Sequence, residues 1–83
     1  MDGESLLRAA QQAWSRHHYG LAIRKAHAAL EADPGRLEAY QIISVCSCAI
    51  GATAEAQEAA THLDEHKRKL VQSLCKSHGV TIE

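Results

Sequence analysis

The feature that most constrains this chain is an internal repeat at an offset of 34 residues. When the first half is shifted onto the second without a gap, the aligned residues keep their size or their apolar character. The aligned pairs are Leu6 with Tyr40, Ala10 with Ser44, Gly20 with Ala54, Ala22 with Ala56, Ala26 with Ala60 and Ala29 with Leu63. A period of this length is typical of a helix–turn–helix unit that stacks on copies of itself. The repeat therefore predicts two successive helix pairs.

The composition predicts the same fold class. Alanine, leucine, glutamate, glutamine, lysine and arginine fill most of the 83 residues, and these side chains lose little freedom on entering a helix. The chain has no phenylalanine, a single proline (Pro34) and no period-two apolar runs. We therefore predict an all-α fold over a single domain, residues 1–83, because so short a chain has a core large enough for one domain only.

The first unit is predicted over about residues 4–35. Its first helix has one apolar stripe, followed by a break at residues 16–20, and its second helix has another stripe. Asp33-Pro34-Gly35 ends the second helix, because proline cannot continue a helix and disfavours helical geometry in the residue before it. The two stripes are Leu6, Leu7, Ala10, Ala13 and Trp14, then Leu21, Ala22, Ala26, Ala29 and Leu30.

The second unit is predicted over about residues 36–64. Its first helix spans about residues 36–50, with inward side chains at Tyr40, Ile43, Ser47 and Ile50, and Gly51 stops it. Thr53 is expected to cap the start of the fourth helix. That helix either breaks near Asp64, which then caps a fifth helix at about residues 65–78, or continues as one long helix. We favour the break, with Gly79 ending the fifth helix and the tail from Val80 to Ile82 packing back.

These residues resemble the tetratricopeptide repeat family. The first unit matches with small Ala10, with Tyr19 and Gly20 at the turn, with small Ala22 and Ala29, and with Pro34 at the exit. The second unit matches at Tyr40, Ser44, Gly51 and Ala56, but Ser47 replaces a large residue and Arg68 stands where Pro34 stood. The resemblance covers residues 4–64. It implies antiparallel helix pairs stacked as a short right-handed superhelix of about five helices, with a C-terminal capping helix.

The resemblance also implies a concave groove, lined by the first helix of each pair, that takes a segment of a protein partner. The residues predicted to bind the partner are Leu7, Arg8, Gln11, Trp14, Gln41, Ile42, Val45 and Cys48. Trp14 fits a groove anchor and a core residue about equally well. The clustered lysines and asparagines with which co-chaperone members of the family hold a carboxylate are missing, which argues against that role.

Little in the chain predicts catalysis, cofactors or metal binding. No nucleophile–base pair or glycine-rich phosphate loop is present, so we predict a protein that is not an enzyme and has no cofactor. His62 and His66 could share a metal ion only on a continuous helix, and Cys75 with His78 would need distant partners, so no metal site is predicted. The net charge of −1 and the single basic run His66–Lys69 do not favour nucleic acid.

Three cysteines make a closed disulfide framework improbable, and buried cytoplasmic thiols are the better interpretation. The acidic N-terminus does not fit a secretory signal, and the apolar run from Ile42 to Ala52 is too short to span a bilayer. No membrane partner and a cytoplasmic location are therefore predicted.

Together these features predict a non-catalytic interaction or scaffolding module. Two helix pairs are fewer than such stacks usually need, and the outer face of the first pair has no cover. We therefore expect either self-association or a piece of a longer protein, and favour the second, such as a bacterial signalling or regulatory protein. The alternatives from other classes are a homo-oligomerisation unit and, less favoured, a metal-binding regulatory module.

Overall fold

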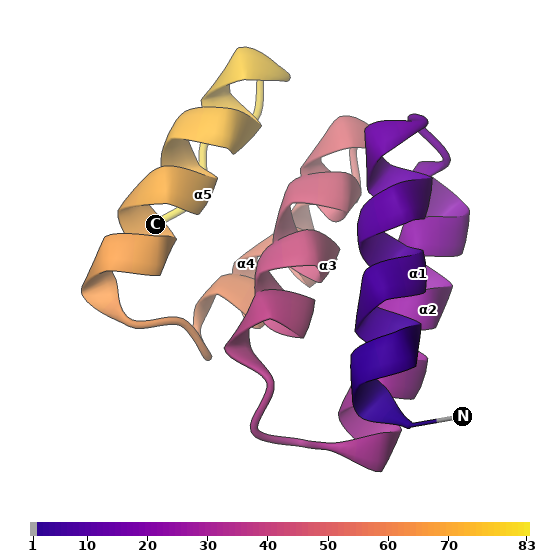
Figure 1. Cartoon of the computed structure of the whole chain (residues 1–83). Helices are drawn as coiled ribbons and strands as arrows, with labels where there is room; N and C mark the ends of the chain where they lie inside the picture. The colour runs from indigo at the N-terminus through magenta and orange to yellow at the C-terminus, as the bar shows by residue number, and fades with distance from the viewer. Residues whose placement is uncertain (1) are drawn as a thin grey trace.

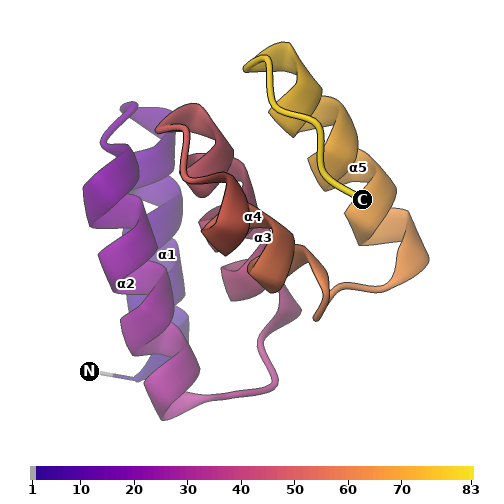
Figure 2. The same ribbon diagram turned by 180° about the vertical axis from the view of Figure 1, so that it is seen from behind.

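The computed structural model describes residues 2–83 and leaves only Met1, the first residue of the predicted domain, outside the description. Five helices and no strands make up this part of the chain, as the all-α prediction required. Figures 1 and 2 show two helical hairpins side by side, followed by a last helix on the far side of α3. None of the helices in residues 2–83 is long and apolar enough to cross a membrane. The helices are α1 (Gly3–Ser15), α2 (Tyr19–Ala32), α3 (Leu37–Ala49), α4 (Thr53–Ala60) and α5 (Glu65–Ser77).

Helices α1 and α5 begin at aspartates that cap them. The carboxylate of Asp2 accepts a hydrogen bond from the amide of Ser5 at 2.7 Å, and Asp64 accepts one from the amide of Lys67 at 2.8 Å. The Ser5 amide also holds the pKa of the Asp2 carboxyl below its usual value. The Asp64 cap confirms that the fourth and fifth helices are separate, because its backbone is extended where a continuous helix would pass.

Glycines in the left-handed region follow α3 and α5. Gly51 has φ 77° and Gly79 has φ 78°, a conformation that side chains with a Cβ rarely adopt, so both predicted helix stops are confirmed. Two details of the prediction were wrong. Thr53 is the first residue of α4 and not its cap, since Ala52 holds that position without a side-chain bond. Ile50 lies at the C-cap of α3 and is 55% exposed, because the helix ends before this side chain can turn inward.

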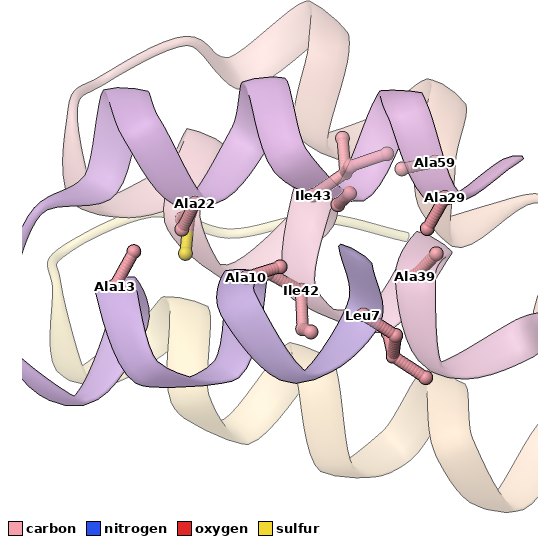
Figure 3. Packing of buried hydrophobic residues seen from close by; sticks show 11 residues of the cluster. Leu7, Ala10, Ala13, Ala22, Ala29, Ala39, Ile42, Ile43 and Ala59 are labelled. Atoms are coloured by element: carbon pink, nitrogen blue, oxygen red, sulfur yellow. The ribbon is translucent and has the colours of Figure 1, made fainter. Parts of the chain in front are cut away.

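Alanines bring the helix backbones together. Ala10, Ala22, Ala26, Ala29 and Ala56 are all fully buried. Figure 3 shows alanines of α1 and α2 facing one another, with Ile42 and Ile43 of α3 beside them. At the start of α1, Gly3 lies so near α2 that an added Cβ would come within 3.2 Å of the Asp33 Cβ. A small side chain at each contact is thus what sets the spacing of the helices.

The repeated positions occupy equivalent environments in the two hairpins. Each of the six aligned pairs falls in the same burial class, from half-buried Leu6 and Tyr40 to exposed Gly20 and Ala54. Where Ser44 replaces Ala10, its hydroxyl donates to the carbonyl oxygen of Ala56 at 2.8 Å. The polar replacement is therefore satisfied inside the core, and the second hairpin keeps the packing of the first.

Enlarging a contact alanine should separate the helices. We expect Ala26→Leu to lower the free energy of unfolding by about 1–3 kcal/mol, because the added carbons have no space between α2 and its neighbours. Ala32→Leu, on an exposed position of the same helix, is the matched control and should change stability by less than about 0.5 kcal/mol. Urea unfolding of the two variants measures the difference, and equal stabilities would contradict the packing.

Helix α5 and the C-terminal tail cover the second hairpin. Val71 and Cys75 of α5 join Val45, Cys48 and Leu63 in a second buried cluster, whereas the first cluster lies mainly among α1, α2 and α3. The tail packs back as predicted, since Ile82 is buried in this cluster. The side-chain amide of Gln57 donates to the carbonyl of Glu83 at 3.0 Å and accepts from its amide at 2.8 Å. The tail is thus held by a buried side chain and by two hydrogen bonds to α4.

A disulfide between Cys48 and Cys75 joins α3 to α5. This corrects the prediction of three reduced thiols. All three cysteines are buried, as expected, but an odd number leaves one unpaired without preventing the other two from bonding. The pairing arises because α5 lies along α3 and brings Cys75 to Cys48, which precedes it by 27 residues.

Breaking this disulfide should weaken the fold. Reduction frees a loop of 27 residues in the unfolded chain, so the free energy of unfolding should fall by about 3 kcal/mol. Urea unfolding with and without dithiothreitol measures the change, and a Cys46→Ala variant should respond equally to the reductant. A thiol count of three, and not one, in the denatured but unreduced protein would contradict the pairing.

Candidate functional site

Half of the predicted partner-binding side chains are not available at the surface. Leu7, Ile42, Val45 and Cys48 are exposed by only 6, 2, 1 and 2%, respectively. Helix α1 packs against α3 near Ile42, and α5 packs against α3 over Val45 and Cys48. These four positions thus lie at the seams between helices, and a partner cannot reach them without displacing α1 or α5.

The other four predicted residues do reach the surface. Arg8 and Gln11 are exposed on α1, and Arg8 lies 3.7 Å from Glu4 in a solvent-exposed ion pair. Gln41 is half-buried on α3. Trp14 is also half-buried and touches both core clusters, so it serves chiefly as packing between α1 and the second hairpin. These four residues leave a mainly polar face with little apolar area for an anchor.

A pocket lies on another side of the molecule, among α2, α3 and α4. We call it the outer pocket. Its volume is about 480 Å3. Figure 2 shows α2 and α4 on this side, with α4 in front of α3, and each of the two packs against α3. Its lining residues are His27, Leu30, Tyr40, Ile43, Ala54, Glu55, Glu58, Ala59 and His62.

The outer pocket has an apolar floor and an acidic wall. Ile43 and Ala59 are buried at its base, with half-buried Leu30 and Tyr40 beside them. Glu55 and Glu58, both exposed, come from the α4 side. Such a combination accepts an apolar side chain and favours positive charge next to it.

An aromatic pair forms one end of the outer pocket. The rings of Tyr40 and His62 stack with centroids 4.1 Å apart and an interplanar angle of 11°. The Nε2 atom of His62 lies 3.4 Å from a carboxylate oxygen of Glu58. His62 lies beyond the end of α4, and the stack on Tyr40 holds it against α3. The aromatic pair therefore closes this end of the pocket.

Sequence reasoning missed this pocket for an identifiable reason. It placed binding on the first helix of each pair, whereas the pocket lies between the second helices, α2 and α4. In the sequence, His62 was interpreted only as a possible metal ligand with His66. A usable signal was present, since Glu55, Glu58 and His62 recur at spacings of three and four and therefore share one helical face.

The cysteine and histidine pairs considered as metal ligands are not available as such in the part of the chain that the structure describes. Cys48 and Cys75 are bonded to one another, so neither can serve the Cys75–His78 metal half-site that the spacing allowed. The break at Asp64 separates His62 from His66, which lies exposed on α5. Within residues 2–83, no group of three or more histidine, cysteine, aspartate and glutamate side chains could hold a metal ion.

Cys46 is a free thiol on α3, enclosed in the buried cluster that lies mainly among α1, α2 and α3. Burial raises the pKa of this thiol from 9.0 to about 12, because a thiolate there would lose its hydration. Since the thiolate is the nucleophile, native Cys46 is unreactive at neutral pH.

Because Cys46 is buried, the free energy of unfolding should decrease as the pH rises in the alkaline range. The unfolded chain loses the Cys46 proton above pH 9 while the folded chain keeps it to about pH 12, so stability should fall as pH rises between these values. Unfolding measured from pH 8 to 11 should show a steeper decline for the wild type than for Cys46→Ala, which removes this group and keeps every other titrating residue. Parallel declines would contradict the burial.

In the basic run His66–Lys69, Arg68 makes a folding contact and Lys69 makes an exposed ion pair. The guanidinium of Arg68 donates to the carbonyl oxygens of Ala60 and Leu63 at 3.3 and 3.2 Å, where α4 ends. Lys69 lies 3.3 Å from Glu65 one turn earlier on α5. Arg68 thus completes the end of α4 by hydrogen bonding, at the repeat position where Pro34 ends α2.

Comparisons of the chain with protein-family models, curated proteins and solved structures found no match. The role of the outer pocket therefore has to follow from its own side chains.

Proposed function

We propose that this chain is a non-catalytic protein-interaction module that binds a segment of a partner protein in the outer pocket. The pocket carries the proposal. Its apolar floor would bury one or two side chains of the partner, and Glu55 and Glu58 would select a segment with positive charge beside them. The site thus differs from the predicted groove, while the predicted kind of function is kept.

The arrangement of the hairpins supports the interaction role and the tetratricopeptide-like architecture. Two hairpins with small residues at equivalent buried positions lie next to each other, and both second helices pack on α3. Stacks of such pairs present surfaces on which polypeptide segments bind. A right-handed superhelix and a place in a larger signalling protein remain parts of the proposal.

The condition of the candidate nucleophiles supports the absence of catalysis. Cys46 is enclosed, with a raised pKa, and Cys48 and Cys75 are bonded. His62 of the outer pocket lies beside Glu58 and stacks on Tyr40, which suits recognition of a ligand by shape and charge better than attack on a substrate.

The disulfide bears on the proposed location. Cytoplasmic proteins rarely keep disulfides, because the glutathione and thioredoxin systems reduce them. A cytoplasmic location would therefore require that the buried Cys48–Cys75 bond resist reduction or that the domain work with its thiols free. The location remains a proposal that a thiol count on protein taken directly from cells can test.

Filling the outer pocket should abolish partner capture. Ala54 is exposed at the pocket, so Ala54→Trp adds an indole there without disturbing the core. We expect this variant to capture at least about tenfold less partner protein from a lysate than the wild type, because the indole occupies the volume that the partner needs. Captured proteins are quantified by mass spectrometry.

The matched control is Gln11→Trp, which places the same bulk on the exposed part of the predicted groove. It should leave capture unchanged. Loss of capture with Gln11→Trp alone would move the binding surface back to α1 and overturn the assignment to the outer pocket.

A further inference from the structure

Helix α5 presents one exposed apolar side chain among basic ones. Leu70 is 47% exposed, while its neighbour Val71 is fully buried against the second hairpin. Lys67, which is half-buried one turn earlier, and exposed Lys69 lie beside Leu70 on the helix. The helix as a whole carries four lysine and arginine side chains against one glutamate. We call Leu70 with Lys67 and Lys69 the basic knob.

The basic knob has the chemistry that the outer pocket selects. An apolar side chain would meet the floor at Ile43 and Ala59, and the lysines would lie beside Glu55 and Glu58. Helix α4, which carries these glutamates, has no basic residue. Ile50 is more exposed than Leu70, but its neighbours from Ala49 to Thr53 carry no charge, so it offers nothing to the acidic wall.

The knob cannot enter the pocket of its own chain. Helix α5 lies on the far side of α3 from α2 in both views (Figures 1 and 2), and the disulfide fixes it there. The outer pocket opens between α2 and α4. Two complementary surfaces on separate sides of one molecule can meet only between molecules.

We propose that the outer pocket of one chain binds the basic knob on α5 of a second copy. The inference rests on the proposed function, and it names the partner of the same site. Because knob and pocket are different surfaces, the contact is heterologous and propagates as an open chain or closes as a ring. One apolar side chain and a few exposed charges make a small interface, so Kd lies in the range of roughly 10 µM to 1 mM.

Sedimentation velocity of the purified, oxidised chain tests the association. Between about 10 µM and 1 mM protein, the weight-average sedimentation coefficient should rise with concentration in low salt. The rise should shrink at about 0.5 M salt, because exposed charges are then screened. A monomer at every concentration in low salt would overturn the proposal.

A pair of single substitutions locates the contact on α5. Leu70→Glu should weaken association by about tenfold or more, since it removes the apolar group and places a carboxylate opposite Glu55 and Glu58. Ile50→Glu makes the same change at the more exposed apolar position. It should leave association unchanged. An equal loss of association in the two variants would indicate non-specific hydrophobic contact and overturn the proposal.

Charge exchange tests the pairing itself. A chain with Glu55→Lys and Glu58→Lys, and a second with Lys67→Glu and Lys69→Glu, should each be monomeric, because pocket and knob then carry like charges. Mixed together, the basic pocket and the acidic knob should form a one-to-one complex. Arg16→Glu with Arg24→Glu, at exposed positions outside both surfaces, is the charge-matched control and should behave as the wild type.

Circular dichroism and thermal melting establish that each exchanged chain is folded, which is expected because the ion pairs that are lost are exposed. Folded exchanged chains that do not combine when mixed would overturn the pairing. If the wild type is monomeric while Ala54→Trp still removes the capture of other proteins, the second copy fails as occupant and the interaction module stands.

Discussion

The close contact of helix backbones at alanine is the constraint on which the whole structure depends. Ala10, Ala22, Ala26 and Ala29 are fully buried, and they allow α1 and α2 to pair and α2 to lie against α3. Such contacts contribute little apolar area per residue, because a methyl group is small. The helices therefore pack closely around a core with little apolar area, and other parts of the chain have to supply the remaining apolar contacts.

These additional contacts are concentrated at the second hairpin. Here α5, the loop before it and the returning tail supply the larger side chains Val71, Leu63 and Ile82 that the alanine seams lack, and the disulfide joins α5 to α3. Helix α4 has 8 residues against the 14 of α2, and Arg68 and the Tyr40–His62 stack secure the turn that follows it. The outer pocket lies beside this short helix.

Much of the fold could be predicted from the sequence. The repeat predicted the two helix pairs. Pro34, Gly51, Asp64 and Gly79, which end or cap helices, predicted the helix ends, the break before the fifth helix and the returning tail. These signals could be interpreted from the sequence because they act locally through backbone geometry. The errors at Thr53 and Ile50 concern helix ends, where one residue of shift turns a side chain from inside to outside.

The site and the disulfide could not be predicted in the same way. Periodicity shows that Val45 and Cys48 share a face of their helix, but whether that face meets α5 or a groove depends on how the last helix docks. The Cys48–Cys75 bond likewise depends on that docking. The predicted partner-binding positions were taken from the register of repeat proteins, in which each helix pair has further pairs on both sides. In this chain, the packing of α1 and α5 against α3 buries half of these partner-binding residues.

The double hydrogen bond between Gln57 and Glu83 has a consequence for tolerance to sequence change. The amide group of Gln57 pairs with the main chain of residue 83, in the way that one strand pairs with another, and it makes no use of the glutamate side chain. Any residue with a free backbone N–H can therefore occupy position 83, while proline cannot donate this bond. The side-chain identity of the tail matters at Ile82, which is buried in the core, and at Val80, which packs against it.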